Sequence, residues 1–200
     1  MKDNYFKSNE EYQNYLKLQI EGSDWSYNSP WGDQMEDAMI NWFAKDVADK
    51  NSSIIDIGCG EGRGLDALMR AGYKKIAGVD IAVDKIKKAK EKGHKIYEED
   101  FHDLKLENQK FDYVFCSHTL EHSYDLKKAF ESILNICNKK IYFILPIFET
   151  EDFVKKHNPS HTSFINDPEY VISILNKINK KYTTEIKNRM SFELWGTIEL

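Results

Sequence analysis

Strand-like and helix-like segments alternate over most of this 200-residue chain, and this alternation limits the possible folds more than any other feature. Short apolar runs rich in β-branched and aromatic residues predict strands. They lie at residues 53–57, 75–79, 95–97, 111–116 and 140–145. Amphipathic segments with helical spacing separate them, at residues 64–71, 84–92 and 125–137. Continuous apolar strands that alternate with helices are typical of a parallel sheet covered on both faces. We therefore predict a doubly wound α/β fold.

The two ends of the chain add further elements to this core. Residues 1–50 are expected to form helices, because they contain a capping box and two apolar stripes at helical spacing. The last predicted elements are a helix at 168–180 and strand-like runs at 182–187 and 191–200. The two runs are expected to close the sheet as an antiparallel pair. We predict one domain over residues 1–200, with an N-terminal helical cap and, from residue 51, a core with a seven-stranded, mostly parallel sheet.

Charge and cysteine content limit the class of protein. The 28 basic and 33 acidic residues give a formal net charge of -5, which argues against a broad phosphate-binding surface and makes nucleic acid an unlikely partner. The longest apolar run, residues 141–148, is far shorter than the ~20 residues of a membrane helix. No secretory signal is recognisable, and three cysteines are too few for a disulfide framework. We expect a reduced, cytoplasmic, soluble protein without a membrane partner.

Four alternating glycines follow the first predicted strand, at positions 58, 60, 62 and 64. Glycine lets the backbone approach a ligand closely, and the following helix offers unpaired N–H groups. Counted from Gly58, the dinucleotide fingerprint G-x-G-x-x-G fails at Arg63. Counted from Gly60, it fails at Leu65. Asp56 precedes the turn, and a carboxylate there suits a cationic ammonium better than a pyrophosphate.

Polar residues also follow the other predicted strands. Asp80 ends the second strand, where a carboxylate can accept the hydroxyl hydrogens of a ribose. Glu99, Asp100 and Phe101 follow the third strand and offer a carboxylate for an exocyclic amine and a ring beside a base. The fourth strand opens into a polar cluster at residues 117–122. All these positions lie at the carboxyl ends of parallel strands, where open α/β sheets bind ligands.

In this order, these residues resemble the class I S-adenosylmethionine-dependent methyltransferases, and most of all the bacterial type 11 families. The resemblance covers residues 52–148 and implies S-adenosylmethionine as the cofactor. It implies that Asp56 and the glycine turn hold the methionine moiety and that Asp80 holds the ribose. It also implies that Ile81, Asp100 and Phe101 lie at the adenine, with the Ser117 backbone near the methionyl amine. The full set expected at the cofactor is Asp56, Gly58, Cys59, Gly60, Gly62, Asp80, Ile81, Asp100, Phe101 and Ser117.

Histidines follow the fourth and fifth predicted strands. Residues 118–122 have the H-x-x-E-H form of an inverted zinc-protease motif, but that motif needs a helix and His118 directly follows a strand. Some small-RNA 2'-O-methyltransferases are similar, with Glu-x-x-Glu-His and a later His that bind a divalent metal, although here His118 replaces the first Glu. We expect His118, His122 and His161 to be the catalytic groups, since imidazole titrates near neutral pH. We assign no metal, although these histidines and Glu121 would also suit one.

The aromatic segment from Trp25 to Trp31 allows two interpretations. Its rings could cover the sulfonium of the cofactor, with Gln34 near the methionine carboxylate. Alternatively, Trp25 and Trp31 could anchor the N-terminal helices on the sheet. The sequence leaves both interpretations open.

We expect an enzyme that moves a methyl group from S-adenosylmethionine to an oxygen or nitrogen nucleophile of a small molecule. Methylation of a macromolecule is disfavoured by the acidic balance of the chain. A regulatory or partner protein that binds S-adenosylmethionine without catalysis is an alternative. A nicotinamide-dependent oxidoreductase ranks third, because the dinucleotide fingerprint fails. No feature of the sequence identifies the methyl acceptor.

Overall fold

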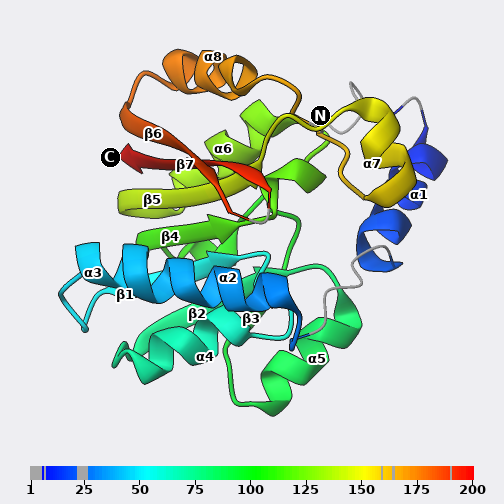
Figure 1. Ribbon diagram of the computed structural model, residues 1–200. Helices are drawn as coiled ribbons and strands as arrows, with labels where there is room; N and C mark the ends of the chain where they lie inside the picture. The colour runs from blue at the N-terminus through cyan, green and yellow to red at the C-terminus, as the bar shows by residue number, and fades with distance from the viewer. Residues whose placement is uncertain (1–5, 7, 22–26, 159, 164, 190) are drawn as a thin grey trace.

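Seven strands form one mixed sheet in the order β3-β2-β1-β4-β5-β7-β6 (Figure 1). The structure is a computed structural model that describes residues 6, 8–21, 27–158, 160–163, 165–189 and 191–200. The strands are β1 (Ser53–Ile57), β2 (Lys75–Asp80), β3 (Ile96–Glu98), β4 (Phe111–Ser117), β5 (Cys137–Pro146), β6 (Lys181–Asn188) and β7 (Phe192–Glu199). The first five run parallel, whereas β7 pairs antiparallel with both β5 and β6. The predicted doubly wound, seven-stranded α/β fold is confirmed.

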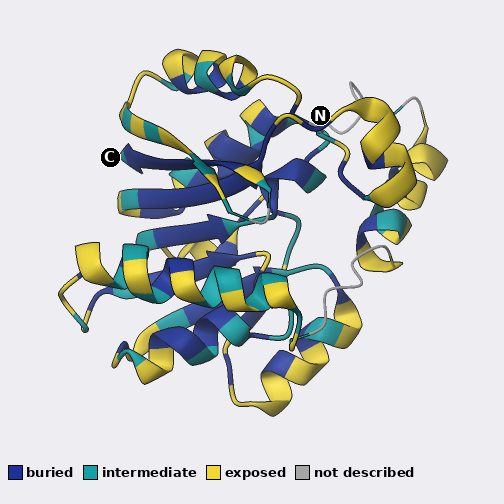
Figure 2. Ribbon diagram, in the orientation of Figure 1, coloured by how far each residue is buried: buried dark blue, intermediate teal, exposed yellow. Residues whose placement is uncertain are grey.

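Helices cover both faces of this sheet. One face carries α6 (Leu126–Asn135) and α8 (Pro168–Ile178), and the other carries α2 (Pro30–Ala38), the π-helical turn η2 (Met39–Phe43), α3 (Ala44–Asp46), α4 (Arg63–Arg70) and α5 (Val83–Glu91). Successive side chains of a strand point to opposite faces. Tyr142 of β5 therefore packs against Phe43, and Phe143 packs against Phe130, with ring centroids 4.9 and 5.3 Å apart. Burial on both faces is why β1 and the second half of β5 are largely apolar, whereas the edge strand β6 is polar and exposed (Figure 2).

The second N-terminal helical segment is not a regular α-helix over its whole length. It begins at Pro30, because Ser29 caps the helix by accepting a hydrogen bond from Gly32 N at 3.2 Å and proline fits the first helical turn. The segment widens into the π-helical turn η2 and ends at Asp46. The sequence also did not predict the short helix α7 (Glu151–His157), which Thr150 caps.

Helix α1 (Asn9–Glu21) and α7 lie beside the carboxyl edge of the parallel strands, on the right in Figure 1. A single 3-10 turn, η4 (Leu120–His122), follows β4 at the same edge. Tyr15 Oη donates to the carbonyl of His122 at 2.8 Å, and Gln19 Nε2 donates to the carbonyl of Ser160 at 2.9 Å. These two bonds fasten α1 over the strand ends. No helix among the described residues has the length and apolar character that a membrane crossing requires.

Candidate active site

A pocket opens at the carboxyl edge of the sheet. Its walls come from the glycine turn after β1, the ends of β2 and β4, helix α1, and residues 27–35 at the start of α2. Predicted site residues that line it are Gly58, Cys59, Gly60, Asp80, Ile81, Phe101, Ser117, His118 and His122. Asp56, Gly62, Asp100 and His161 lie outside this lining. The sequence did not single out Tyr15, Gln19, Arg63 or Lys85, which also line the pocket.

Two glycines shape the floor of the pocket for different reasons. Both have backbone conformations that favour glycine, with φ of +75° at Gly58 and +53° at Gly60. A Cβ on Gly58 would overlap the side chain of Thr119 from the loop after β4. A Cβ on Gly60 would meet no atom closer than 4.0 Å, at Lys85 Cδ. Gly58 therefore lets two loops pack together, while Gly60 keeps the floor of the pocket open.

The carboxylate of Asp80 fastens the glycine turn to β2. Its Oδ2 accepts a hydrogen bond from Gly60 N at 2.7 Å. Its Oδ1 accepts bonds from the backbone N–H groups of Ile81 and Ala82, both at 2.8 Å. Three N–H donors hold this carboxylate in one position before any ligand binds.

Asp56 lies behind the glycine turn, 4% exposed. Its Oδ2 would lie 2.6 Å from a Cβ on Gly64, so the missing side chain of Gly64 makes room for the carboxyl group. Burial and the negative charge of Asp80 raise the pKa of Asp56 to about 8. Gly62 also faces away from the pocket, towards His94. Both residues therefore lie on the side of the turn that faces away from the pocket.

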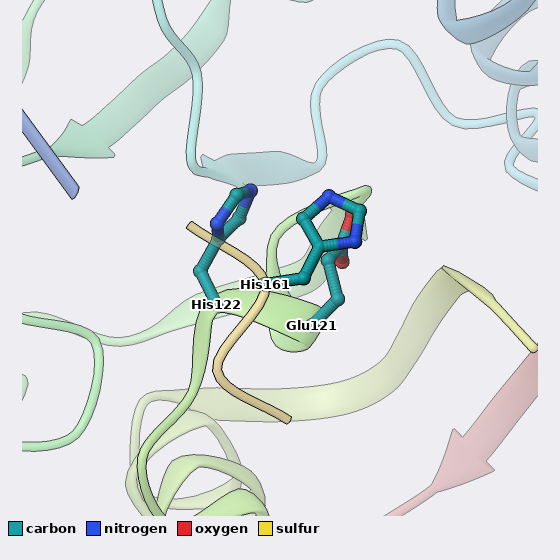
Figure 3. A group of neighbouring side chains, drawn as sticks. All are labelled: Glu121, His122 and His161. Carbon is teal, nitrogen blue, oxygen red and sulfur yellow. The ribbon is translucent and has the colours of Figure 1, made fainter. Parts of the chain in front are cut away.

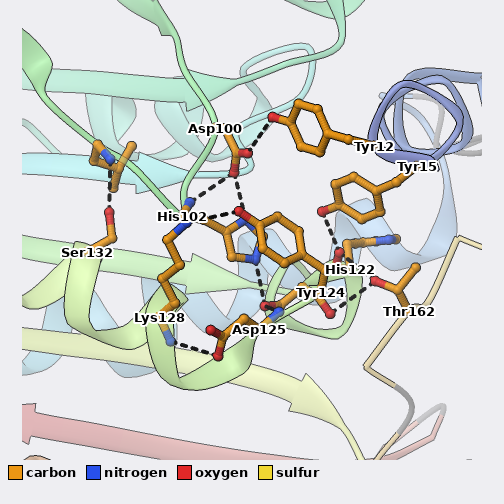
Figure 4. Close-up of polar contacts among 12 residues, drawn as sticks. Tyr12, Tyr15, Asp100, His102, His122, Tyr124, Asp125, Lys128, Ser132 and Thr162 are labelled. Atoms are coloured by element: carbon orange, nitrogen blue, oxygen red, sulfur yellow. Dashed lines mark hydrogen bonds and ion pairs between the residues drawn. The ribbon is translucent and has the colours of Figure 1, made fainter. Parts of the chain in front are cut away.

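Asp100 points towards α1 (Figure 4). It accepts hydrogen bonds from Tyr12 Oη at 3.1 Å and from His102 Nδ1 at 2.6 Å. Burial would raise the pKa of Asp100, but the bonds from His102 outweigh it and lower that pKa. The neighbouring Glu99 lines the pocket in its place.

The other ring nitrogen of His102 lies 2.7 Å from Ser123 Oγ, which completes an Asp-His-Ser chain. Such a chain activates serine in hydrolases only when the hydroxyl can reach a substrate. Ser123 is 0% exposed, and its Oγ accepts a bond from Asp125 N. The chain therefore ties together the loops after β3 and β4.

His118 lies between two buried carboxylates. Its Nδ1 is 3.6 Å from Glu121 Oε1, and its Nε2 is 3.3 Å from Glu193 Oε1 on β7. Burial would lower the pKa of His118, but the bonds to these carboxylates outweigh burial and raise it to about 9. His118 is therefore a cation at neutral pH, in a pocket wall that also contains Trp31, whose ring centroid is 5.5 Å from that of His118.

His122 and His161 come together with Glu121 (Figure 3). Their ring centroids are 5.0 Å apart, and one potential ligand atom from each of the three residues lies within 4.8 Å of the others. His122 Nδ1 is 2.9 Å from the carbonyl of Ser160, and His161 Nδ1 is 2.8 Å from Glu149 Oε1. These bonds fix both rings and assign their N–H groups to Nδ1.

Electrostatics distinguishes the two rings. Burial and the nearby cationic rings lower the pKa of His122, although Glu121 opposes them. His161 is also buried, but the bond to Glu149 and the negative charges of Glu121 and Glu149 together outweigh burial and raise its pKa. Glu121 Oε2 is buried without a hydrogen-bond partner among the described residues. The cluster thus presents a neutral imidazole at the pocket and an unsatisfied carboxylate oxygen behind it.

The aromatic segment reaches the pocket. Tyr27, Trp31 and Met35 all line it. Gln34 does not, and its carbonyl accepts a bond from Arg189 at 3.2 Å. Trp25 lies outside the described residues. Of the two interpretations of this segment, the position of Trp31 favours the one that covers a ligand.

Comparisons with known proteins bear on the domain family and the fold. A family model described as a methyltransferase domain matches residues 48–189. The magnesium protoporphyrin IX methyltransferase of Synechocystis is 16% identical, with a TM-score of 0.66 over 96% of this chain and 95% of that one. A plantazolicin methyltransferase is 11% identical, with a TM-score of 0.68 over 98% and 93%. At such identities the likeness shows a shared fold. No match was found among curated proteins.

The raised pKa of Asp56 makes stability depend on pH. It lies above the value of about 3.9 in an unfolded chain, so the folded protein keeps a proton that the unfolded chain releases. The contribution of this proton to the free energy of unfolding is complete below about pH 4 and is lost as the pH rises towards 8. We expect Asp56→Asn to reduce this loss, so that at pH 8 the variant melts at a higher temperature than the parent. Thermal unfolding at pH 5 and pH 8, with the exposed Asp152→Asn as control, measures this. Equal losses in parent and Asp56→Asn would show that Asp56 is ionised in the folded state.

Proposed function

Because the chain belongs to the methyltransferase domain family that matches residues 48–189, we propose that it transfers a methyl group from S-adenosylmethionine to an oxygen or nitrogen nucleophile of a small molecule. The predicted methyltransferase family is confirmed. The cofactor residues, the acceptor class, the single-domain assignment and the cytoplasmic location stay predictions.

The pocket fits S-adenosylmethionine in its chemistry. The observation that carries this proposal is the pre-positioned carboxylate of Asp80 beside an open glycine turn. Asp80 would accept the ribose hydroxyls, with Ile81 and Phe101 at the adenine. Ser117 adds a buried hydroxyl in the pocket wall that lacks a hydrogen-bond partner among the described residues. A buried polar atom of this kind is satisfied when a polar ligand binds.

The protein itself has little covalent chemistry to perform. Bound S-adenosylmethionine supplies a methyl group that its sulfonium already activates. The chain therefore needs to position the acceptor in line and to accept its proton. Asp80 and the glycine turn hold one side of the pocket. Tyr15 and Gln19 of helix α1 line the pocket as well, together with His122.

His122 is the histidine best suited to accept a proton from the acceptor. It lines the pocket, its pKa is lowered by burial, and its Nδ1–H donates to Ser160, which leaves Nε2 as an acceptor. His161 lies behind it and is oriented by Glu149. His118, one of the three predicted catalytic groups, is an ion-paired cation, and we propose that it contributes charge to the pocket wall.

The same cluster also has the donor set of a metal centre. Glu121, His122 and His161 offer one oxygen and two nitrogen ligands, and the second nitrogen of each ring is already bonded to an outer partner. The partnerless Oε2 of Glu121 supports this second candidate. A divalent cation there would act as a Lewis acid near the acceptor.

A binding experiment tests the cofactor assignment. We expect saturable binding of S-adenosylhomocysteine in a calorimetric titration, because Asp80 suits its ribose. We expect no binding of NAD, because the glycine turn lacks the dinucleotide fingerprint. Saturable NAD binding without a response to S-adenosylhomocysteine would refute the proposal.

Substitution of the histidines tests the acceptor side. We expect His122→Ala and His161→Ala to leave cofactor affinity within a few-fold and to reduce methyl transfer by about 10²–10⁴, the usual contribution of a general base. His157→Ala, on the exposed side of α7, is the control and should be active. Elemental analysis separates the two candidate roles, since stoichiometric metal that both variants lose indicates ligation. Parental rates in both variants would show that the cluster is structural.

A further inference from the structure

One wall of the pocket comes from outside the sheet and its crossover helices. Tyr27 lies just before α2, Trp31 and Met35 lie within α2, and all three line the pocket. Gly58 and Gly60 also line the pocket, in the turn that leads into α4. This wall of the pocket is therefore complete only while residues 27–35 stay beside the glycine turn.

Arg63 joins these two walls. It is the first residue of α4 and directly follows Gly62 of the glycine turn. Its Nη1 donates to the carbonyls of Tyr27, at 2.8 Å, and Ser29, at 3.3 Å. The Arg63 side chain lines the pocket and is only 15% exposed. One guanidinium thus bonds to two backbone carbonyls just before α2.

The carboxylates of α2 hold the same guanidinium from the other side. Arg63 Nε donates to Glu36 Oε2 at 3.1 Å, and Nη2 is paired with Asp33. A cation at the N-terminus of a helix opposes the helix dipole, so helix stability alone does not account for this placement. Asp33 and Glu36 offset that repulsion and leave Nη1 directed at the carbonyls.

Gly32 provides the space for this contact. A Cβ at Gly32 would overlap Arg63 Nη1. Its backbone does not have positive φ, so the close approach of Arg63 is what requires a residue without a side chain. The segment and the arginine therefore fit each other by shape as well as by hydrogen bonding.

A second residue of α4 fastens the start of the segment. Asp66 lies one turn after Arg63, and its Oδ2 accepts a bond from Tyr27 Oη at 2.6 Å. His94 Nε2, 2.8 Å from Asp66 Oδ1, holds this carboxylate. Lys92 Nζ lies 3.5 Å from the centre of the Tyr27 ring. Both the backbone and the side chain of Tyr27 are thus attached to the helix that follows the glycine turn.

We infer that Arg63 is a positioning residue that fastens residues 27–35 over the cofactor pocket and so sets how long the bound cofactor stays. The inference rests on the proposed function, because it takes S-adenosylmethionine and S-adenosylhomocysteine as the ligands of this pocket. Arg63 acts through Tyr27 and Ser29, which it holds in place. Without Arg63 the wall opens more often, and the cofactor leaves faster.

Dissociation kinetics test this inference. We expect Arg63→Ala to release S-adenosylhomocysteine at least tenfold faster than the parent in a stopped-flow displacement experiment. We expect the KM for S-adenosylmethionine to rise about as much, with kcat within twofold, because the acceptor side is unchanged. Arg63→Lys keeps the charge but cannot bond to both carbonyls and both carboxylates. Its release rate should therefore lie between those of the parent and Arg63→Ala. Gly32→Ala displaces Nη1 and should reproduce the faster release.

Arg189→Ala is the matched control. Arg189 also bonds to a carbonyl and a carboxylate of α2, those of Gln34 and Asp37, both at 3.2 Å, but neither residue lines the pocket. We expect this variant to release the ligand within twofold of the parental rate. Equal release rates for the parent, Arg63→Ala and Gly32→Ala would overturn the inference.

A measurement without ligand separates this inference from the proposed function. Hydrogen exchange of the amides at 31–36 should be faster in Arg63→Ala than in the parent and in Arg189→Ala. A parent protein that binds no S-adenosylhomocysteine refutes the proposed function. Unchanged exchange in Arg63→Ala refutes the role of Arg63 whether or not the ligand binds. Should Arg63→Ala fail to fold, Arg63→Lys and Gly32→Ala carry both measurements.

Discussion

The pocket depends on the hydrogen bonds that the carboxylate of Asp80 accepts. By accepting N–H bonds from Gly60, Ile81 and Ala82, this carboxylate fixes the glycine turn after β1 to the end of β2. These bonds hold the carboxylate in place, so the group needs no rearrangement to meet a polar ligand. Its substitution would change the turn as well as the ligand contact. Asp80 is therefore as much a part of the fold as a part of the site.

Charge balance organises the histidine side of the pocket in a similar way. Buried carboxylates there each face a histidine: Glu193 and Glu121 face His118, and Glu149 faces His161. Burying an isolated charge is costly, and pairing offsets that cost. Glu121 and Glu149 nevertheless each keep one buried oxygen without a hydrogen-bond partner among the described residues. Such unsatisfied atoms next to a pocket mark the part of the molecule where a bound group would add most to stability.

Local patterns in the sequence predicted the strands, the glycine turn and the positions of Asp80 and His122 at the carboxyl edge. These features depend on spacing along the chain and on the rule that parallel strands end at one edge. The orientation of side chains depends on contacts between distant segments, which spacing does not reveal. Asp100 turns away from the pocket because Tyr12 and His102 donate to it. The charge of His118 depends on Glu193, which belongs to the antiparallel strand β7 at the far end of the chain.

A crystal structure of the protein with S-adenosylhomocysteine tests the central claim most directly. The account predicts ligand density beside the glycine turn, with both ribose hydroxyls within hydrogen-bonding distance of Asp80 and with Trp31 and Tyr27 enclosing the ligand from the side of α2. Density at another place, or a ribose that does not contact Asp80, would contradict the account.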